Sequence, residues 1–204
     1  MSVNKLEMKT IQKIPAFFGE ADVIRSIQLL PGVTTVGEGA SGFNVRGGNI
    51  DQNLILIDEA PVYNSAHALG FFSVFNPDAV KNVKLVKGGI PAEYGGRLSS
   101  LLDVRLRDGN SKQFEMNGGV GQLFSRLSLQ APLKKDKSSF IIAARRSYID
   151  LFFPLLGENF ENTSIFFYDL TAKLNYTINK NNKIFLSGYF GRDNIALDVF
   201  GFNW

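Results

Sequence analysis

The sequence predicts an α+β domain followed by antiparallel β-strands of an incomplete transmembrane β-barrel. Two observations support this fold class. The first half combines one helical pattern with short alternating apolar runs and paired glycines, which is typical of a compact α+β domain. The second half consists of longer runs that are apolar on one face and polar on the other, with alternately short and long connections. We therefore expect two domains, residues 1–109 and residues 110–204.

The first domain contains one clear helix and several short strands. Residues 22–30 place Val23, Ile24, Ile27 and Leu30 on one helical face. An acidic residue opens this segment and a proline–glycine pair follows it, as expected at the two ends of a helix. Strands are expected at residues 33–36, 43–46, 54–57, 82–87 and 101–107, with an edge strand within residues 1–19.

Two motifs in this half resemble helix starts. Asn76-Pro77-Asp78 has the form of an N-cap with proline at the first helical position, so a short helix is expected there. Residues 37–42 match the dinucleotide fingerprint G-x-G-x-x-G, which needs a helix to begin among its glycines. A strand-like run at residues 43–46 follows instead, so this motif predicts a loop and no cofactor.

The second domain predicts five barrel strands, of which residues 168–178 give the clearest pattern. The even-numbered residues of that run are Tyr, Leu, Ala, Leu, Tyr and Ile, and the odd-numbered residues are all polar. Such a two-residue period is what a strand between lipid and a polar lumen requires. The long connection at residues 148–163 is expected outside the cell and the short ones at the periplasmic rim. The expected strands are residues 113–119, 123–131, 139–147, 164–178 and 183–191.

The composition argues against several function classes. The absence of cysteine excludes disulfides, thiolate metal sites and cysteine nucleophiles. The net charge of +3 is spread along the chain, which does not favour nucleic-acid binding. The single histidine, His67, falls in a predicted loop, where we expect it to be solvated. Asp58 and Glu59 would point to opposite faces of a strand, so they could not act on one substrate as an acid–base pair. From these observations together we predict no enzyme, cofactor or metal site.

The chain also lacks two kinds of apolar segment. No apolar run reaches the roughly 18 residues of a membrane-spanning helix, although a protein that crosses by β-strands needs none. The first residues lack the apolar stretch of a signal peptide. We therefore expect Met1 to be an internal methionine and the chain to be one part of a longer protein.

Five motifs, in order, give the first domain a family resemblance. They begin at Asp22 (DVIR), Leu30 (LPGV), Asn44 (NVRGG), Leu56 (LIDEAPV) and Val83 (VKLVKGGIPAEYGG). Over residues 8–108 this set is similar to the plug domain of TonB-dependent outer-membrane receptors, and most similar to members of the Bacteroidota type. The motif residues that the resemblance marks as structural are Gly47, Gly48, Asp58, Lys87, Gly88, Gly89, Tyr94, Gly95 and Gly96, with the glycines supplying positive φ or close approach.

The resemblance implies a plug inside a barrel of about 22 strands in the cell outer membrane. A periplasmic TonB-type energy-coupling protein would bind an upstream segment and drive uptake of a large nutrient. Outer-membrane lipid would surround the barrel, and a surface lipoprotein is a further candidate partner. Family plugs are held by arginines that meet carboxylates on the barrel wall, and Arg46 and Arg97 are the candidates for such a latch here. The alternative for Arg46 is a salt bridge that braces its own turn.

Two other functions stay open. A barrel-type adhesin or assembly factor could use a plug-like domain without transport. A soluble periplasmic α+β domain would leave the strand pattern of residues 114–191 unexplained.

Overall fold

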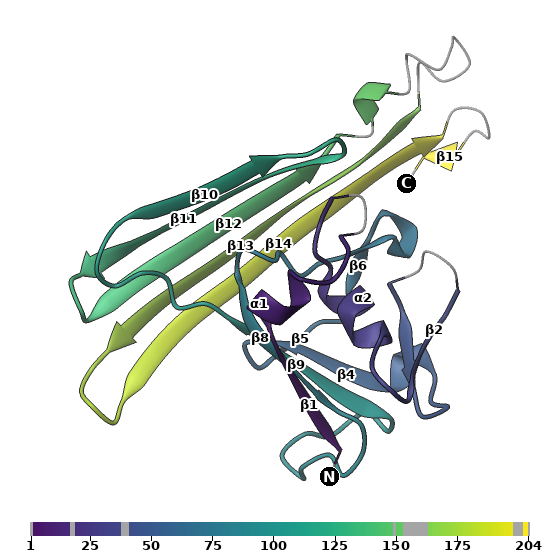
Figure 1. Ribbon diagram of the computed structural model, residues 1–204, viewed down its shortest axis with the longest axis horizontal. Helices are drawn as coiled ribbons and strands as arrows, with labels where there is room; N and C mark the ends of the chain where they lie inside the picture. The colour runs from purple at the N-terminus through teal and green to yellow at the C-terminus, as the bar shows by residue number, and fades with distance from the viewer. Residues whose placement is uncertain are drawn as a thin grey trace. The chain divides into compact units, whose positions relative to one another are not determined.

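A computed structural model describes residues 2–16, 19–37, 41–148, 150–152, 163–197 and 202–203. The chain separates into two compact units, Met1–Arg107 and Asp108–Trp204 (Figure 1). No helix in the described part of the chain is long and apolar enough to cross a membrane.

Unit 1 is built on a five-stranded mixed sheet. The strands lie in the order β1 (Val3–Glu7), β8 (Val80–Val86), β9 (Ser100–Leu106), β4 (Asn53–Ile57) and β5 (Ala60–Pro61). Neighbouring strands are antiparallel except for β4 and β9, which run parallel and pair Asn53 with Ser100. Strand β1 is the edge strand that the sequence predicted within residues 1–19.

Smaller elements complete unit 1. The helices are α1 (Met8–Ile11) and α2 (Val23–Gln28), with short 3-10 helices η1 (Ile50–Gln52) and η2 (Ala68–Gly70). Two further strand pairs are β2 (Val33–Thr35) with β3 (Phe43–Val45), and β6 (Ala66–His67) with β7 (Phe72–Ser73).

The predicted helix at residues 22–30 is confirmed as α2. Asp22 caps it, since one carboxylate oxygen accepts a hydrogen bond from the Arg25 backbone N–H at 3.0 Å. The other oxygen accepts from the Ser73 N–H at 2.8 Å, so the same side chain also fixes β7. Val23 and Ile24 of α2 are fully buried in the core of the unit.

Several elements of unit 1 differ from what the sequence predicted. Asn76 to Asp78 form a turn that leads into β8 rather than a helix, because the Asn76 carbonyl accepts from the Ala79 and Val80 N–H groups and the chain then extends. The helix α1 at Met8–Ile11 was not expected. His67 lies in β6 and is 3% exposed, because the β6–β7 pair lies in the packed part of the unit rather than in a solvated loop.

Unit 2 is a six-stranded antiparallel sheet whose strands follow chain order. They are β10 (Glu115–Val120), β11 (Phe124–Lys134), β12 (Ser138–Ser147), β13 (Ser164–Thr177), β14 (Lys183–Leu197) and β15 (Phe202–Asn203). The five expected strands are all present. The far edge of the fifth, β14, was expected to be unpaired, but the short strand β15 pairs with its last residues.

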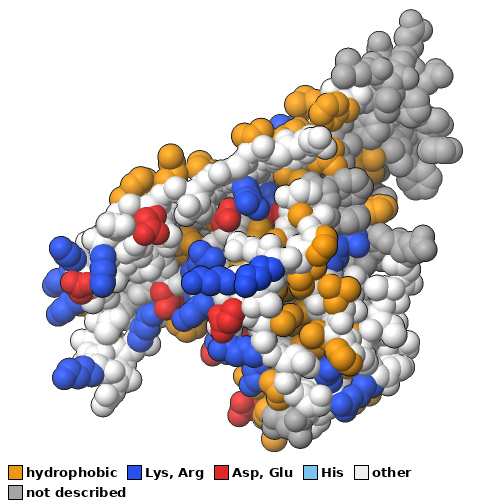
Figure 2. Space-filling model, in the orientation of Figure 1, with side chains coloured by type: hydrophobic (Ala, Val, Ile, Leu, Met, Phe, Trp, Pro, Cys, Tyr) orange, Lys and Arg blue, Asp and Glu red, His pale blue; other side chains and the backbone are white. Residues whose placement is uncertain are grey.

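The exposure of side chains in unit 2 is reversed relative to a water-soluble sheet. Along β13 the polar residues Asp169, Thr171 and Asn175 are buried, whereas Leu170 and Leu174 are each 42% exposed. Large exposed apolar side chains recur on β10, β11, β12 and β14. Figure 2 shows hydrophobic side chains gathered along the upper outline of this sheet. One face of unit 2 is therefore polar and the opposite face is apolar and uncovered.

Candidate functional site

The NVRGG motif forms a tight turn after β3. Arg46 and Gly47 both have positive φ, at 49° and 81°, and the Gly48 N–H donates to the Val45 carbonyl at 2.9 Å. The two residues in the left-handed region are thus Arg46 and Gly47, one position earlier than the glycine pair suggested. A left-handed arginine is uncommon. It is held here by the hydrogen bond from the Arg46 N–H to the Gly32 carbonyl and by the Gly48–Val45 hydrogen bond of the turn.

Gly48 is required for a different reason, close approach. A Cβ atom at this position would lie 2.6 Å from the Ser99 Cβ atom. Ser99 is fixed in place because its hydroxyl donates to the Val45 carbonyl at 2.8 Å and its N–H donates to the Gln52 carbonyl at 2.9 Å. The segment before β9 therefore packs directly on the turn, a contact that the sequence did not reveal.

The VKGG motif at the end of β8 meets the same turn. Lys87 is 6% exposed, and its ammonium donates to the Pro31 carbonyl at 2.7 Å. Gly88 has φ of 133°, and a Cβ atom there would lie 3.0 Å from a terminal nitrogen of Arg46. Because the Arg46 N–H also donates to the Gly32 carbonyl, three of the motifs converge on one small region.

The EYGG motif is a single turn, as predicted. The Tyr94 N–H donates to the Pro91 carbonyl at 2.9 Å, and Tyr94 packs on a core cluster of β4, β8 and β9. Gly89 and Gly96 have positive φ of 65° and 83°. Gly95 is a correction, since its φ is not positive and a Cβ atom added to it would meet nothing within 4 Å.

Asp58 and Glu59 are the two residues of the β4–β5 hairpin turn, with φ of 45° and 77°. The expectation that they are neighbouring strand residues was wrong. One Asp58 carboxylate oxygen accepts from the Leu106 N–H at 3.0 Å, and Glu59 forms an ion pair with Arg105 at 2.8 Å. Both carboxylates therefore have structural partners in the fold.

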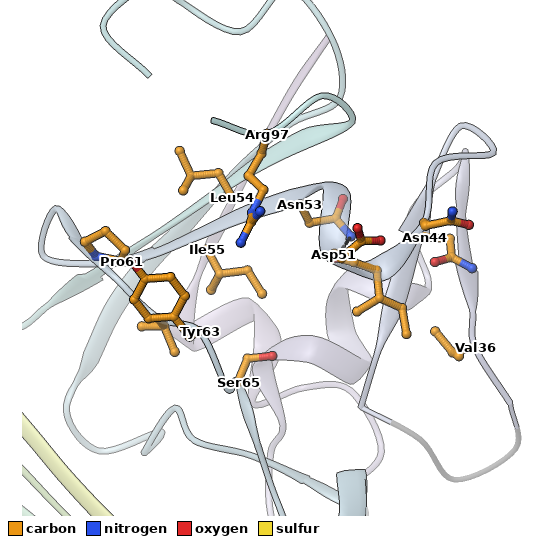
Figure 3. A pocket seen from close by; sticks show the side chains of 13 residues that line it. Val36, Asn44, Asp51, Asn53, Leu54, Ile55, Pro61, Tyr63, Ser65 and Arg97 are labelled. Atoms are coloured by element: carbon orange, nitrogen blue, oxygen red, sulfur yellow. Dashed lines mark hydrogen bonds between the residues drawn. The ribbon is translucent and has the colours of Figure 1, made fainter. Parts of the chain in front are cut away.

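Arg46 and Arg97 lie in different surroundings. Both are exposed, and neither forms an ion pair with any residue that the structure describes, so the salt bridge considered for the Arg46 turn is not seen there. Arg97 points into a pocket of about 530 Å³ that Asp51 and Tyr63 also line (Figure 3). Both polar and apolar side chains line the pocket, Asn53 and Leu54 among them. In the described part of the chain no group of three or more acidic or histidine side chains could hold a metal ion.

The segment that contains these motifs matches a known protein family. Residues 1–100 match the family model for the TonB-dependent receptor plug domain. The chain belongs to the TonB-dependent receptors. Unit 1 is accordingly called the plug, and β10–β15 are called the barrel strands.

Solved structures show the same fold. The chain is similar to the siderophore receptor PirA from Acinetobacter baumannii, with 16% identity and a TM-score of 0.66 over 95% of this chain and 32% of that one. The siderophore receptor PirA from Pseudomonas aeruginosa has 18% identity and a TM-score of 0.64, over 95% of this chain and 34% of that one. The outer membrane transporter YddB from Escherichia coli has 12% identity and a TM-score of 0.64, over 94% of this chain and 33% of that one. The chain thus spans about a third of these proteins. A comparison with curated proteins finds no match.

The polar face of the barrel strands carries a buried ion pair that the sequence did not predict. Arg145 of β12 and Asp169 of β13 are cross-strand partners, with nitrogen–oxygen distances of 2.6 and 2.7 Å and side chains 2% and 0% exposed. The Arg145 guanidinium also lies 5.2 Å from the centre of the Phe167 ring. The only sequence signal was that Asp169 occupies the polar phase of its strand, since the phase of Arg145 in β12 also contains Ile141 and Ala143.

A second charged cluster anchors the start of the barrel segment. Asp108 binds Lys183 at 2.6 Å and Lys173 at 3.4 Å, and its backbone carbonyl accepts from the Ser139 hydroxyl at 2.7 Å. Burial alone would raise the pKa of Asp108, but the hydrogen bond from Lys183 and the two lysine charges outweigh it and lower the pKa below its usual range. Asp108 therefore stays ionised at neutral pH and holds the first residues of this unit on β13 and β14.

Proposed function

We propose that the chain is the plug, residues 1–109, and the first barrel strands, residues 110–204, of an outer-membrane active transporter. The plug would close the lumen of the complete barrel. A periplasmic TonB-type protein would act on a segment upstream of the plug, and a large nutrient such as a siderophore, an oligosaccharide or a peptide would pass. The motif set further suggests a receptor of the Bacteroidota type, in which a surface lipoprotein is a candidate partner.

The observation that carries this proposal is the reversed polarity of the barrel strands. In water, a face with exposed Leu170, Leu174, Leu186 and Phe190 would expose a large continuous apolar surface, which soluble monomers rarely carry. In a lipid bilayer the same face is the favourable one, and the buried charges of the other face line a lumen. The outer membrane is the bacterial compartment in which such strands are found.

Arg46 and Arg97 are the residues to which we assign the latch that holds the plug in the barrel. Both guanidiniums are exposed on the plug and lack ion-pair partners among the described residues, so they are free to meet carboxylates elsewhere on the barrel wall. Such pairs would be partly desolvated in a narrow lumen and stronger than exposed surface pairs. They would hold the plug at rest and break when it is pulled.

The experiment compares uptake in bacteria that lack this gene, the TonB-type partner, or both. Growth is measured on single large nutrients supplied as the only source of iron, carbon or amino acids. We expect one nutrient to be lost equally in the three strains, since receptor and partner act in one step. Unchanged uptake of every nutrient, together with reduced attachment of cells to surfaces, would contradict transport and support the adhesin alternative.

A further inference from the structure

A row of polar residues crosses the apolar face of the barrel strands at one level. Arg146 of β12 is the cross-strand partner of Tyr168 of β13, and Tyr168 is the partner of Arg192 of β14. Directly paired residues project on the same face of a sheet. Tyr168 belongs to the outward phase that includes Leu170, and its ring lies 6.2 Å from that of Phe190. Two arginines therefore flank a tyrosine on the face that the proposed function assigns to lipid.

The row lies near one end of the apolar band, where Phe166 is the last large apolar residue in the outward phase of β13. Toward the short turns, each outward position of β13 is apolar as far as Tyr176. The row lies at the opposite end, next to the long connection of residues 148–163. Arginine at such a border reaches the level of lipid head groups rather than the acyl chains.

A hollow of about 500 Å³ adjoins the row on the apolar side. It is lined by Leu127, Ala144, Leu170 and Phe190, and Arg146 and Tyr168 lie at its end. Ala144 forms its floor because its small side chain stands between the larger ones of the neighbouring strands. Of the two arginines of the row, Arg146 lines this hollow, and Arg192 lies one strand further on, as the cross-strand partner of Tyr168. An apolar hollow beside such a pair of cations is complementary to an acyl chain that ends in an anion.

We propose that this surface binds a membrane lipid with a phosphate-bearing head group, the phosphate held between Arg146 and Arg192 and an acyl chain in the hollow. This inference rests on the proposed membrane location of the strands. Two strand spacings separate the arginine backbones by about 10 Å, a gap that two arginine side chains can close around one phosphate. Guanidinium binds phosphate with paired N–H donors, which favours it over lysine at such a site.

The two arginines differ in what already holds them. Arg192 is exposed and has no ion-pair partner among the described residues. Arg146 is 47% exposed, packs 5.2 Å from the centre of the Phe166 ring, and forms an ion pair with Asp150 at 3.3 Å. Arg192 therefore supplies most of the attraction, Arg146 is pre-oriented, and Asp150 weakens binding by competing for it.

The test uses the full-length receptor purified from outer membranes in a non-ionic detergent, with binding followed by native mass spectrometry. The probes are phosphatidic acid, phosphatidylcholine with the same acyl chains, and inorganic phosphate. We expect phosphatidic acid to bind the wild-type receptor best. Arg192→Gln should weaken it about fivefold, the effect of one basic side chain at an anionic membrane surface. Arg146→Gln should weaken it by less, because Asp150 already pairs with Arg146.

Matched variants separate the parts of the site. Lys180→Gln removes the same charge from the β13–β14 turn at the opposite end of the band and should leave binding unchanged. Ala144→Phe should fill the hollow and weaken phosphatidic acid binding, whereas Asp150→Asn should strengthen it. Equal binding of phosphatidic acid by wild type, Arg146→Gln and Arg192→Gln would overturn the lipid site, as would inorganic phosphate binding as tightly as the lipid. If the receptor is absent from the outer membrane, the proposed function itself fails.

Discussion

Replacing Gly48 by alanine tests the convergence of the plug motifs on one turn. The added Cβ would meet the Ser99 side chain, with 2.6 Å to the Ser99 Cβ atom, and Ser99 cannot move without losing its hydrogen bond to Val45. Overpacking of this kind costs about 1 to 3 kcal/mol, and a partly buried hydrogen bond about 1 kcal/mol. We therefore expect Gly48→Ala to lower the free energy of unfolding of the isolated plug by about 2 to 4 kcal/mol.

The assay is urea unfolding of residues 1–107, with two glycine controls. Gly47→Ala has open space but a φ of 81°, so it should cost about 1 to 2 kcal/mol from backbone strain alone. Gly95→Ala has neither constraint and should change stability by less than about 0.5 kcal/mol. Ser99→Gly should remove most of the additional cost of Gly48→Ala in the double variant. A Gly48→Ala plug as stable as Gly95→Ala would refute the close approach.

Three further predictions follow from the two units. Residues 1–107 should be soluble and monomeric alone, whereas residues 108–204 should aggregate without detergent because their apolar face and strand edges are uncovered. Size-exclusion chromatography of each half tests this. A soluble monomeric second half would contradict the barrel assignment. Because the pKa of Asp108 is lowered in the folded state, its ion pairs stabilise that state above the ordinary carboxyl pKa of about 4, and this contribution is lost as pH falls through the lowered value. Asp108→Asn should reduce the acid sensitivity of thermal unfolding of the detergent-solubilised receptor, and an unchanged pH profile would count against the cluster. Changing Arg46 and Arg97 together to glutamine should raise leak of a large antibiotic into cells while leaving the isolated plug's stability nearly unchanged; an intact seal would reject the latch.

The sequence predicted best those elements whose pattern is local. The barrel strands alternate strictly, so β13 could be recognised from residues 168–178 without knowledge of its neighbours. Helix α2 carries its own cap at Asp22 and its own apolar face. The turn residues of Asn76 to Asp78 are also local, but a capping pattern does not make a helix when the following residues pair in a sheet, as Val80–Val86 do with β1 and β9.

The candidate site was harder to predict from the sequence because it depends on contacts between segments that are distant in the chain. Gly48 is explained only by Ser99, and Gly88 lies beside Arg46. The lipid-facing row joins Arg146, Tyr168 and Arg192 through the register of three strands, which residue spacing alone does not fix when a long connection intervenes.

The two faces of β13 provide the most direct test of the central claim that this strand separates lipid from a polar lumen. The chain has no cysteine, so Leu174→Cys and Asn175→Cys each place one reactive thiol on opposite faces of the same strand. Each variant of the full-length receptor, with cysteines elsewhere in it replaced, is labelled with a fluorophore and reconstituted into bilayers containing a nitroxide-bearing lipid. We predict strong quenching by the lipid nitroxide at position 174 and little at position 175. Equal quenching at the two positions, or stronger quenching at 175, would contradict the account.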